Sequence, residues 1–313
     1  MITTVTLNAA IDKTYFLNDF ALSGVHRVQK MISEPGGKGI NVAKVLHRLG
    51  LESVATGFVG GHSGEHILAL LEARGIRHQF VTVAGESRLC LNLIDETAGI
   101  QTEVLEAGPS IGAADWERLK ETVAQLAGDS EYVVFSGSLP AGVDSGAYAE
   151  LVQVVQQRGA KAIVDTSGEP LAKVLAAKPF MVKPNESELA VLLGKEAHTL
   201  GIEEIRDAMH RWHATGIPLV AVSLGSEGSL VSYEGTCYKV TPPKVELVNP
   251  VGCGDTFVAG MAAGLARGLS SEDTIVLATA AAAANAEERQ AGCVAVEKLA
   301  DLQKRVKVEI VNG

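Results

Sequence analysis

Residues 131–168 read EYVVFSGSLPAGVDSGAYAELVQVVQQRGAKAIVDTSG and contain one complete strand–helix–strand repeat. The runs YVVF and KAIV are short and apolar, which is typical of strands buried on both faces. The segment between them, AYAELVQVVQQRG, has the apolar spacing of an amphipathic helix. Strands joined through a helix pair in parallel, and the helix covers one face of the sheet. This stretch therefore predicts a parallel α/β fold.

The same alternation extends in both directions along the chain. Further strands are predicted within residues 2–8, 53–60, 180–185 and 217–225. Further helices are predicted within residues 36–50, 64–75, 187–194 and 207–216. No Pro/Ser-rich linker or low-complexity tract divides the chain. We expect a single domain over residues 1–313, built on a doubly wound, mostly parallel sheet flanked by helices.

Two regions interrupt this alternation. KTYFLNDF (13–20) with HRVQKMIS (26–33), and SRLCLNLID (87–95) with GIQTEVLE (99–106), are pairs of strand-like runs without a helix between them. The connection DETAG (95–99) has hairpin chemistry. We expect lid strands inserted at about residues 12–33 and 87–106, forming a small β-sheet over a site. An edge extension of the main sheet is the alternative.

Composition excludes several classes of function. The 313 residues are 47% hydrophobic and 20% charged, with a formal net charge of −10, so nucleic-acid and anionic-membrane partners are not expected. No apolar run approaches the roughly 20 residues of a membrane span, and the N-terminus lacks the pattern of a signal peptide. The four cysteines form no CxxC pair. These features predict a cytoplasmic protein.

Polar and glycine-rich segments follow five of the predicted strands. In a doubly wound fold, ligands bind beyond the carboxyl ends of the strands. Each segment by itself is equally typical of a tight turn. Together they predict a ligand site along one edge of the sheet; the segments are residues 8–12, 136–140, 165–166, 183–188 and 223–228.

The stretch NPVGCGDTFVAGMAAGL (249–265) places a glycine-rich turn before an apolar helix. Free amides at a helix N-terminus attract an anion, and glycine allows it to approach closely. Asp255 lies in the first turn, where it would accept a proton from an attacking hydroxyl while the amides hold a migrating phosphoryl group. Helix capping is the alternative role for Asp255.

Three motifs make the chain similar to the PfkB, or ribokinase-like, family of sugar kinases. GGKGINVA (36–43) resembles the N-terminal glycine signature of the family, NESE (185–188) its NxxE motif, and GCGD (252–255) its C-terminal GAGD signature. GGKG, SGSLP, KPNESEL and VSLGSEG resemble the branch of tagatose-6-phosphate kinases and 1-phosphofructokinases. The resemblance implies a doubly wound sheet with a β-lid, ATP and Mg²⁺ as cofactors, and a homodimer formed through the lid.

The activity implied is ATP-dependent phosphorylation of a ketohexose phosphate, with tagatose 6-phosphate giving tagatose 1,6-bisphosphate as the first choice. The second choice is a 1-phosphofructokinase, which converts fructose 1-phosphate to fructose 1,6-bisphosphate. An unphosphorylated-sugar or nucleoside kinase of the same fold would have no obvious use for Lys38 and Arg88 together. A non-catalytic α/β ligand-binding protein would not need Asp255 beside an anion hole. Lys38 belongs to no Walker A loop, because Gly39 follows it where Ser or Thr is required.

The resemblance also implies a role for each matched residue. Asp255 is the expected catalytic base, and the amides of Gly252, Cys253 and Gly254 form the expected anion hole. The expected substrate-binding residues are Asp12, Gly37, Lys38, Asn41, Arg88 and Ser138. The expected nucleotide-binding residues are Lys183, Asn185, Ser223, Gly225, Ser226, Gly228 and Asn285. Glu188 is expected to bind Mg²⁺ through water.

Three residues depart from the family pattern. Cys253 replaces the usual Ala or Ser but keeps the backbone amide, so the anion hole is expected to survive. Asn249 stands where many members carry an Asp associated with a monovalent cation, which puts activation by potassium in doubt. Ala9 replaces a proline that is common in this branch, and little effect is expected.

Overall fold

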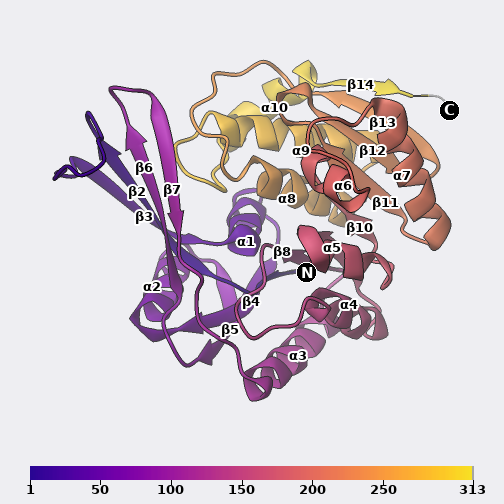
Figure 1. Ribbon diagram of the computed structural model, residues 1–313. Helices are drawn as coiled ribbons and strands as arrows, with labels where there is room; N and C mark the ends of the chain where they lie inside the picture. The colour runs from indigo at the N-terminus through magenta and orange to yellow at the C-terminus, as the bar shows by residue number, and fades with distance from the viewer. Residues whose placement is uncertain (312–313) are drawn as a thin grey trace.

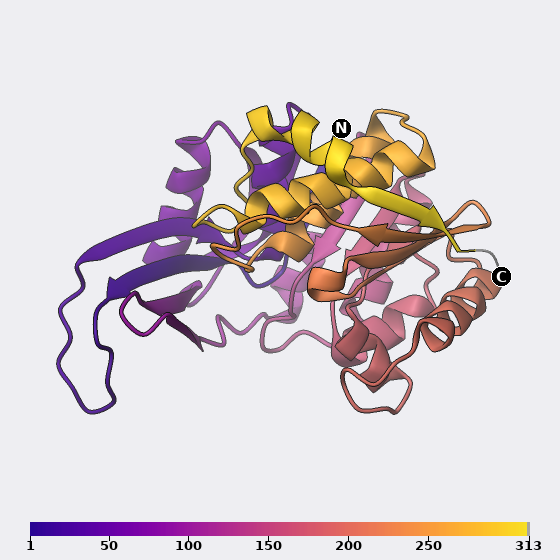
Figure 2. The same ribbon diagram turned by 90° about the horizontal axis from the view of Figure 1, so that it is seen from above.

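The computed structural model describes residues 1–311 and has two parts, a large helix-covered sheet and a small four-stranded sheet (Figure 1). Seen from above, the strands β2 and β3 of the small sheet extend away from the main body (Figure 2). The predicted α/β fold with a separate small sheet is confirmed. Within the described residues, no helix is long and apolar enough to cross a bilayer.

The large sheet has ten strands in the order β14-β13-β12-β11-β10-β9-β8-β1-β4-β5. All neighbours from β5 to β11 pair in parallel. The chain runs from β1 outward to β5 and then returns to β8 on the other side of β1, so the topology switches direction between β1 and β8. The strands are β1 (Ile2–Thr6), β4 (Ser53–Gly60), β5 (Arg77–Val83), β8 (Tyr132–Ser136), β9 (Lys161–Asp165), β10 (Met181–Val182), β11 (Leu219–Ser223), β12 (Ser229–Tyr233), β13 (Thr236–Thr241) and β14 (Lys307–Ile310).

One edge of the large sheet is antiparallel, which the sequence analysis did not anticipate. Strands β11 to β14 pair antiparallel in succession. The turn between β12 and β13 has Glu234 at φ 53° and Gly235 at φ 79°. Two successive residues with positive φ are typical of the two-residue turn that joins hairpin strands. The sheet is therefore mostly parallel, as predicted, with a hairpin-built edge.

Helices cover both faces of the large sheet. One face packs against α1, α8, α9 and α10, and the other against the helices from α3 to α7. Helix α2 packs beside α1 and the base of the small sheet. The helices are α1 (Lys38–Arg48), α2 (Gly61–Glu72), α3 (Ala113–Gly128), α4 (Ala147–Gln157), α5 (Gly168–Leu175), α6 (Glu186–Leu192), α7 (Ile202–Thr215), α8 (Cys253–Ala266), α9 (Ser271–Ala286) and α10 (Val296–Arg305), with a 3₁₀ turn at Gly225–Glu227.

Small residues let α8 and α9 pack closely. A Cβ on Gly260 would overlap the backbone of Ala278, and one on Gly264 would come within 2.8 Å of Thr274. The alanine run of α9 is buried along almost its whole length. This close packing buries the first turn of α8, which carries Asp255, against the body of the protein.

The small sheet, called the lid below, has the strand order β3-β2-β6-β7. Strand β2 pairs antiparallel with β3 and parallel with β6, and β6 pairs antiparallel with β7. Its inner face, toward the main domain, carries polar side chains, whereas its outer face exposes apolar ones. The strands are β2 (Ala10–Leu17), β3 (Lys30–Gly36), β6 (Arg88–Asp95) and β7 (Ile100–Leu105).

Candidate active site

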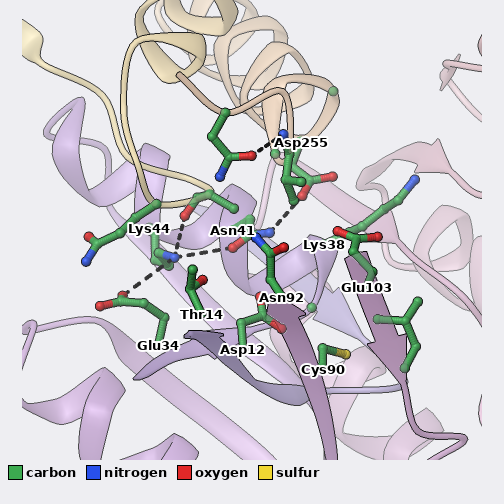
Figure 3. A pocket seen from close by; sticks show the side chains of 18 of the residues that line it. Asp12, Thr14, Glu34, Lys38, Asn41, Lys44, Cys90, Asn92, Glu103 and Asp255 are labelled. Carbon is green, nitrogen blue, oxygen red and sulfur yellow. Dashed lines mark hydrogen bonds and ion pairs between the residues drawn. The ribbon is translucent and has the colours of Figure 1, made fainter. Parts of the chain in front are cut away.

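A cleft of about 460 Å³ opens between the lid and the carboxyl ends of the central strands (Figure 3). The inner face of the lid forms one wall, and the first turn of α1 forms the floor. The N-terminus of α8 and the segment after β10 form the opposite wall. This is the edge of the sheet at which the sequence predicts a ligand site.

The glycine turn before α8 is shaped by close packing. Gly252 has φ +83°, and a Cβ there would lie 2.9 Å from Ala291 Cβ and from the amide nitrogen of Gly292. The first hydrogen bond of the α8 ladder runs from the Thr256 amide to the Gly252 carbonyl and is 2.8 Å long. Among residues 1–311, the amides of Gly254 and Asp255 donate to no protein acceptor. They are available to an anion in the cleft.

Asp255 lines the cleft but is only 5% exposed. Its Oδ2 accepts a hydrogen bond from Asn41 Nδ2 at 2.8 Å. Burial raises the pKa of this carboxyl to about 6, and the nearby Lys38 ammonium opposes that rise. A carboxylate with a pKa near neutrality can accept a proton from a hydroxyl and later release it, as a general base must.

Two lysines flank a buried carboxylate beside the α8 turn. Asp165, at the end of β9, lies 3.1 Å from Lys183 Nζ and 3.4 Å from Lys38 Nζ. Burial acts to raise the pKa of Asp165, but the two ammonium groups outweigh it and hold that pKa below its ordinary value. Lys183 Nζ would be 3.5 Å from a Cβ on Gly254, so the ammonium lies beside the free amides. The predicted phosphate-binding lysines therefore bring positive charge to the same place.

The NxxE motif forms a capping box at the start of α6. Asn185 Oδ1 accepts from the Glu188 amide at 2.7 Å, and Glu188 Oε2 accepts from the Asn185 amide at 2.9 Å. Both residues also line the cleft. Within the described residues, Glu188 Oε1 accepts no hydrogen bond, so one carboxylate oxygen remains for a ligand.

This arrangement fits a Mg²⁺ ion held mainly by nucleotide phosphates. Mg²⁺ is usually bound through one or two carboxylates, with phosphate and water oxygens completing its coordination. Glu188 Oε1 supplies one such oxygen at the edge of the cleft. In the described part of the chain, no group of three or more His, Cys, Asp or Glu residues could enclose a metal ion by itself.

The lid brings Asp12 and Arg88 to the cleft. Asp12 is on β2 directly beside Cys90 of β6, and its carboxylate packs against Gly36, where a Cβ would overlap it. Burial raises the pKa of Asp12, and the Lys44 and Arg88 cations oppose the rise. Arg88 Nε donates to the Asn8 carbonyl at 3.2 Å, which holds the guanidinium at the base of the lid. Gly37 and Asn41 line the floor below.

The structure corrects the prediction for Asn285. Its side chain is completely buried. Its Oδ1 accepts from Thr256 Oγ1 and from the amides of Gly292 and Cys293, and its Nδ2 donates to the Val251 carbonyl. Asn285 therefore joins the α8 turn to the segment after α9, and its side chain does not line the cleft.

Several other predicted residues lie outside the cleft. Ser138 is exposed on the loop after β8 and does not line the cleft. Ser223 lines the cleft, but Gly225, Ser226 and Gly228 form a turn beyond it. A Cβ on Gly228 would overlap the Val240 carbonyl, which gives this glycine a packing role. The Cys253 side chain points toward Asn285 Nδ2 at 3.5 Å, so only its backbone faces the helix terminus.

Lys44 of α1 and Glu34 of lid strand β3 also line the cleft, and neither was predicted as a site residue. Asp165 was predicted only as part of the ligand-binding edge of the sheet, with no role of its own. Lys44 follows Asn41 by three residues, a spacing that puts both side chains on one face of α1. Helix α1 is buried from Gly39 to Leu46, so a lysine inside this otherwise uncharged stretch is the signal that could have revealed the residue.

Comparisons with known proteins agree with this geometry. A family model described as pfkB family carbohydrate kinase matches residues 5–298. A tagatose-6-phosphate kinase from Staphylococcus epidermidis is 38% identical over 310 residues, which are 98% of this chain and 99% of that protein.

Solved structures of similar proteins cover almost the whole chain. Phosphofructokinase-2 from Escherichia coli in complex with fructose-6-phosphate is 30% identical, with a TM-score of 0.88 over 97% of this chain and 98% of the other. A protein from Thermotoga maritima described as a possible 1-phosphofructokinase is 28% identical, with a TM-score of 0.87 over 100% of both chains.

Proposed function

The chain belongs to the pfkB family of carbohydrate kinases, and on that premise we propose that it transfers a phosphoryl group from ATP to tagatose 6-phosphate. The product is tagatose 1,6-bisphosphate. The observation that carries the proposal is the position of Asp255, a buried carboxylate with a raised pKa beside free amides at a helix N-terminus. A non-catalytic ligand-binding protein would have no use for that combination.

The chemistry assigned to this geometry is an in-line phosphoryl transfer. Asp255 accepts the proton of the sugar hydroxyl as the oxygen forms its bond to the γ-phosphorus, and the bond to the departing ADP oxygen breaks. The amides at the start of α8 and the Lys183 ammonium lie where negative charge would collect on the transferred group. Bound Mg²⁺ would neutralise phosphate oxygens, and Glu188 with Asn185 would hold it.

The sugar phosphate would lie between the lid and the floor of the cleft. Asp12 and Asn41 would hydrogen-bond its hydroxyls, and Gly37 leaves room for the ring. Lys38 and Arg88 would bind its phosphate, which carries close to two negative charges at neutral pH. Because the protein has a net charge of −10, attraction must come from such local cations.

The preference for tagatose 6-phosphate rests on the Staphylococcus epidermidis relative, which is the most similar of the proteins described above. The similarity to the Thermotoga maritima protein supports fructose 1-phosphate as the second candidate. Both substrates present a phosphate at one end and a primary hydroxyl at the other, so the same charges serve either.

We also propose that two chains pair through the outer faces of their lids. Met31, Leu93 and Val104 lie on that face, and the side chains of Met31 and Val104 are 54% and 49% exposed. Apolar side chains exposed together on a projecting sheet are typical of an interface. Light scattering should give the mass of a dimer for the parent protein and of a monomer for a Met31→Glu, Val104→Glu variant.

A substrate panel tests the proposed function. ADP release should be measured with tagatose 6-phosphate, fructose 6-phosphate, fructose 1-phosphate, free tagatose and a nucleoside. We expect the highest kcat/KM with tagatose 6-phosphate, and ³¹P NMR should detect a second phosphate ester on the product. Turnover of free sugars or nucleosides with none of any sugar phosphate would contradict the proposal.

A further inference from the structure

A chain of polar side chains leads from the lid to the proposed catalytic base. Lys44 Nζ, on α1, donates to Asn41 Oδ1 at 3.3 Å, and Asn41 Nδ2 donates to Asp255 Oδ2 at 2.8 Å. Lys44 Nζ also donates to the Ala291 carbonyl at 2.6 Å and lies 3.8 Å from Glu34 of lid strand β3. Figure 3 shows the contacts of Lys44 with Asn41 and Glu34, and the next contact from Asn41 to Asp255.

Resting on the proposed function, we propose that Lys44 is a positioning residue for phosphoryl transfer. It holds the Asn41 amide so that one oxygen of Asp255 stays bound and the other stays free for the substrate. It also anchors the Ala291 carbonyl behind the α8 turn.

The orientation of the Asn41 amide follows from its two neighbours. An ammonium group has donors only, so the amide must present its oxygen to Lys44 and its NH₂ group to Asp255. The reversed orientation would place donor against donor at Lys44 and acceptor against acceptor at an ionised Asp255. While Asp255 is ionised, both neighbours favour the observed orientation.

After proton transfer, Lys44 alone fixes the orientation of the Asn41 amide. A protonated Asp255 could donate to the Asn41 oxygen as readily as accept from its NH₂ group. The carboxyl then no longer fixes the amide, and only the ammonium does. Lys44 therefore prevents the amide from reversing and trapping the proton on Asp255.

The second contact of Lys44 supports the anion-binding turn. The Ala291 carbonyl that Lys44 binds belongs to the residue packed against Gly252, where a Cβ would come within 2.9 Å. The next residue, Gly292, packs equally closely against Asn41. One ammonium thus fixes the segment that packs directly against the glycine turn.

A purely structural ion pair with Glu34 does not account for Lys44. Arg74 Nη2 lies 2.7 Å from both carboxylate oxygens of Glu34, so the Glu34 charge already has a partner. Lys44 is only 8% exposed, and burial lowers its pKa, against the attraction of Glu34 and Asp12. Beyond that attraction, Lys44 donates hydrogen bonds to Asn41 and Ala291, which an ion pair with Glu34 alone does not explain.

The pKa of Asp255 distinguishes the two roles of Lys44. If Lys44 only stabilised the fold, its replacement would leave this pKa unchanged. The titratable groups around Asp255 are Lys38 of α1, Asp165 at the end of β9 and Lys183 after β10. Those around Lys44 are Glu34, Asp12, Arg74 and the Cys293 thiol. The hydrogen bond from Asn41 lowers the pKa of Asp255, so its loss should raise that pKa. The acid limb of kcat then moves to higher pH.

The principal test compares Lys44→Met, Asn41→Ala and the double variant. We expect Lys44→Met to lower kcat about 10- to 100-fold and to move the acid limb up by roughly one pH unit, with little change in the KM for ATP. In the Asn41→Ala background, the factor by which Lys44→Met lowers kcat should be at least about fivefold smaller than in the parent. Lys120→Met, a lysine-to-methionine change remote on α3, is the matched control and should leave kcat unchanged.

Two further variants separate charge from donor geometry. Lys44→Arg keeps a donors-only group and should retain most of the turnover, whereas Lys44→Gln introduces an acceptor and should behave like Lys44→Met. Thermal unfolding identifies any variant that fails to fold. If Lys44→Met is one of them, the turnover of Lys44→Arg is compared with that of Lys44→Gln instead. Equal turnover in Lys44→Arg and Lys44→Gln would overturn the proposal, as would an unchanged acid limb in Lys44→Met.

A measurement without turnover separates this proposal from the proposed function. The ¹³C resonance of the Asp255 carboxyl, assigned by its loss in Asp255→Asn, can be titrated in the parent and in Lys44→Met. A higher pKa in the variant supports the role of Lys44 even if the substrate panel fails. An identical titration curve contradicts that role even if tagatose 6-phosphate is turned over.

Discussion

Replacing Arg88 with alanine should raise the KM for tagatose 6-phosphate by about one to two decades. A hydrogen bond to a charged group contributes roughly 1.5–3 kcal/mol, and each 1.4 kcal/mol is tenfold. Because Arg88 Nε already donates to the Asn8 carbonyl, the two terminal NH₂ groups remain for the phosphate. The cleft is open to solvent at the lid, so we expect the lower half of this range.

Steady-state ADP release at varied sugar phosphate and at varied ATP measures the effect of Arg88→Ala. The KM for ATP, and any turnover of free tagatose, should change less than about twofold, because Arg88 lies at the base of the lid. Arg118→Ala removes an exposed arginine of α3 that lies outside the cleft and pairs with Asp115, and it should leave all kinetic parameters unchanged.

A second variant controls for an indirect effect on Asp12. The Arg88 charge opposes the burial that raises the pKa of Asp12, so Arg88→Ala also disturbs that carboxyl. Arg88→Lys keeps a cation but loses the planar fork, and its KM should fall between those of the parent and Arg88→Ala. An unchanged KM for every sugar phosphate in Arg88→Ala would refute the phosphate site and favour a kinase for unphosphorylated sugars.

Four other predictions follow from the site. Asp255→Asn should keep the parent melting temperature and ATP affinity but lower kcat about 10²–10⁴-fold; turnover within threefold of the parent would leave Asp255 a helix cap. In the parent, kcat should fall about tenfold per pH unit below the Asp255 pKa of about 6, because only the ionised carboxylate accepts the proton; a flat profile down to pH 5 would argue against this base. Glu188→Gln should shift the Mg²⁺ activation curve to higher concentration, and an unchanged curve would reduce the motif to a capping box. Gly252→Ala should destabilise the fold by about 1–2 kcal/mol in urea unfolding, because φ is +83° and Ala291 blocks a Cβ; equal stability would contradict that packing.

Much of the fold could be predicted from local sequence patterns. Buried parallel strands are short apolar runs, and crossover helices show a 3.6-residue period. The sequence of residues 131–168 therefore predicts a strand–helix–strand unit with parallel strands. The lid was predictable because two strand pairs lack a helix between them. The antiparallel edge was not recognised, since strands β12 and β13 meet at a turn where Glu234 adopts positive φ, which its residue type does not signal.

The candidate site was only partly predictable from its motifs. The stretch 252–255 indicates an anion-binding turn with a base. Its two glycines allow an anion to approach the amides closely, and its aspartate can accept a proton, wherever in the fold the turn lies. Asn185 and Glu188 form a capping box as well as lining the cleft, and their spacing predicts the box as readily as a metal site.

The amino-acid sequence by itself determined the strand–helix alternation, the glycine turn before α8 and the presence of Asp255 in its first helical turn, because these depend on contacts between near neighbours. Only the tertiary structure decided which polar groups are buried together. It closed Asn285 inside the protein, paired Asp165 with two lysines, and brought Lys44 within reach of Ala291 and Asn41 within reach of Asp255. Asp165, Ala291 and the two lysines are far apart in the chain, and the pKa of a carboxyl depends on burial and on charges that only folding brings close.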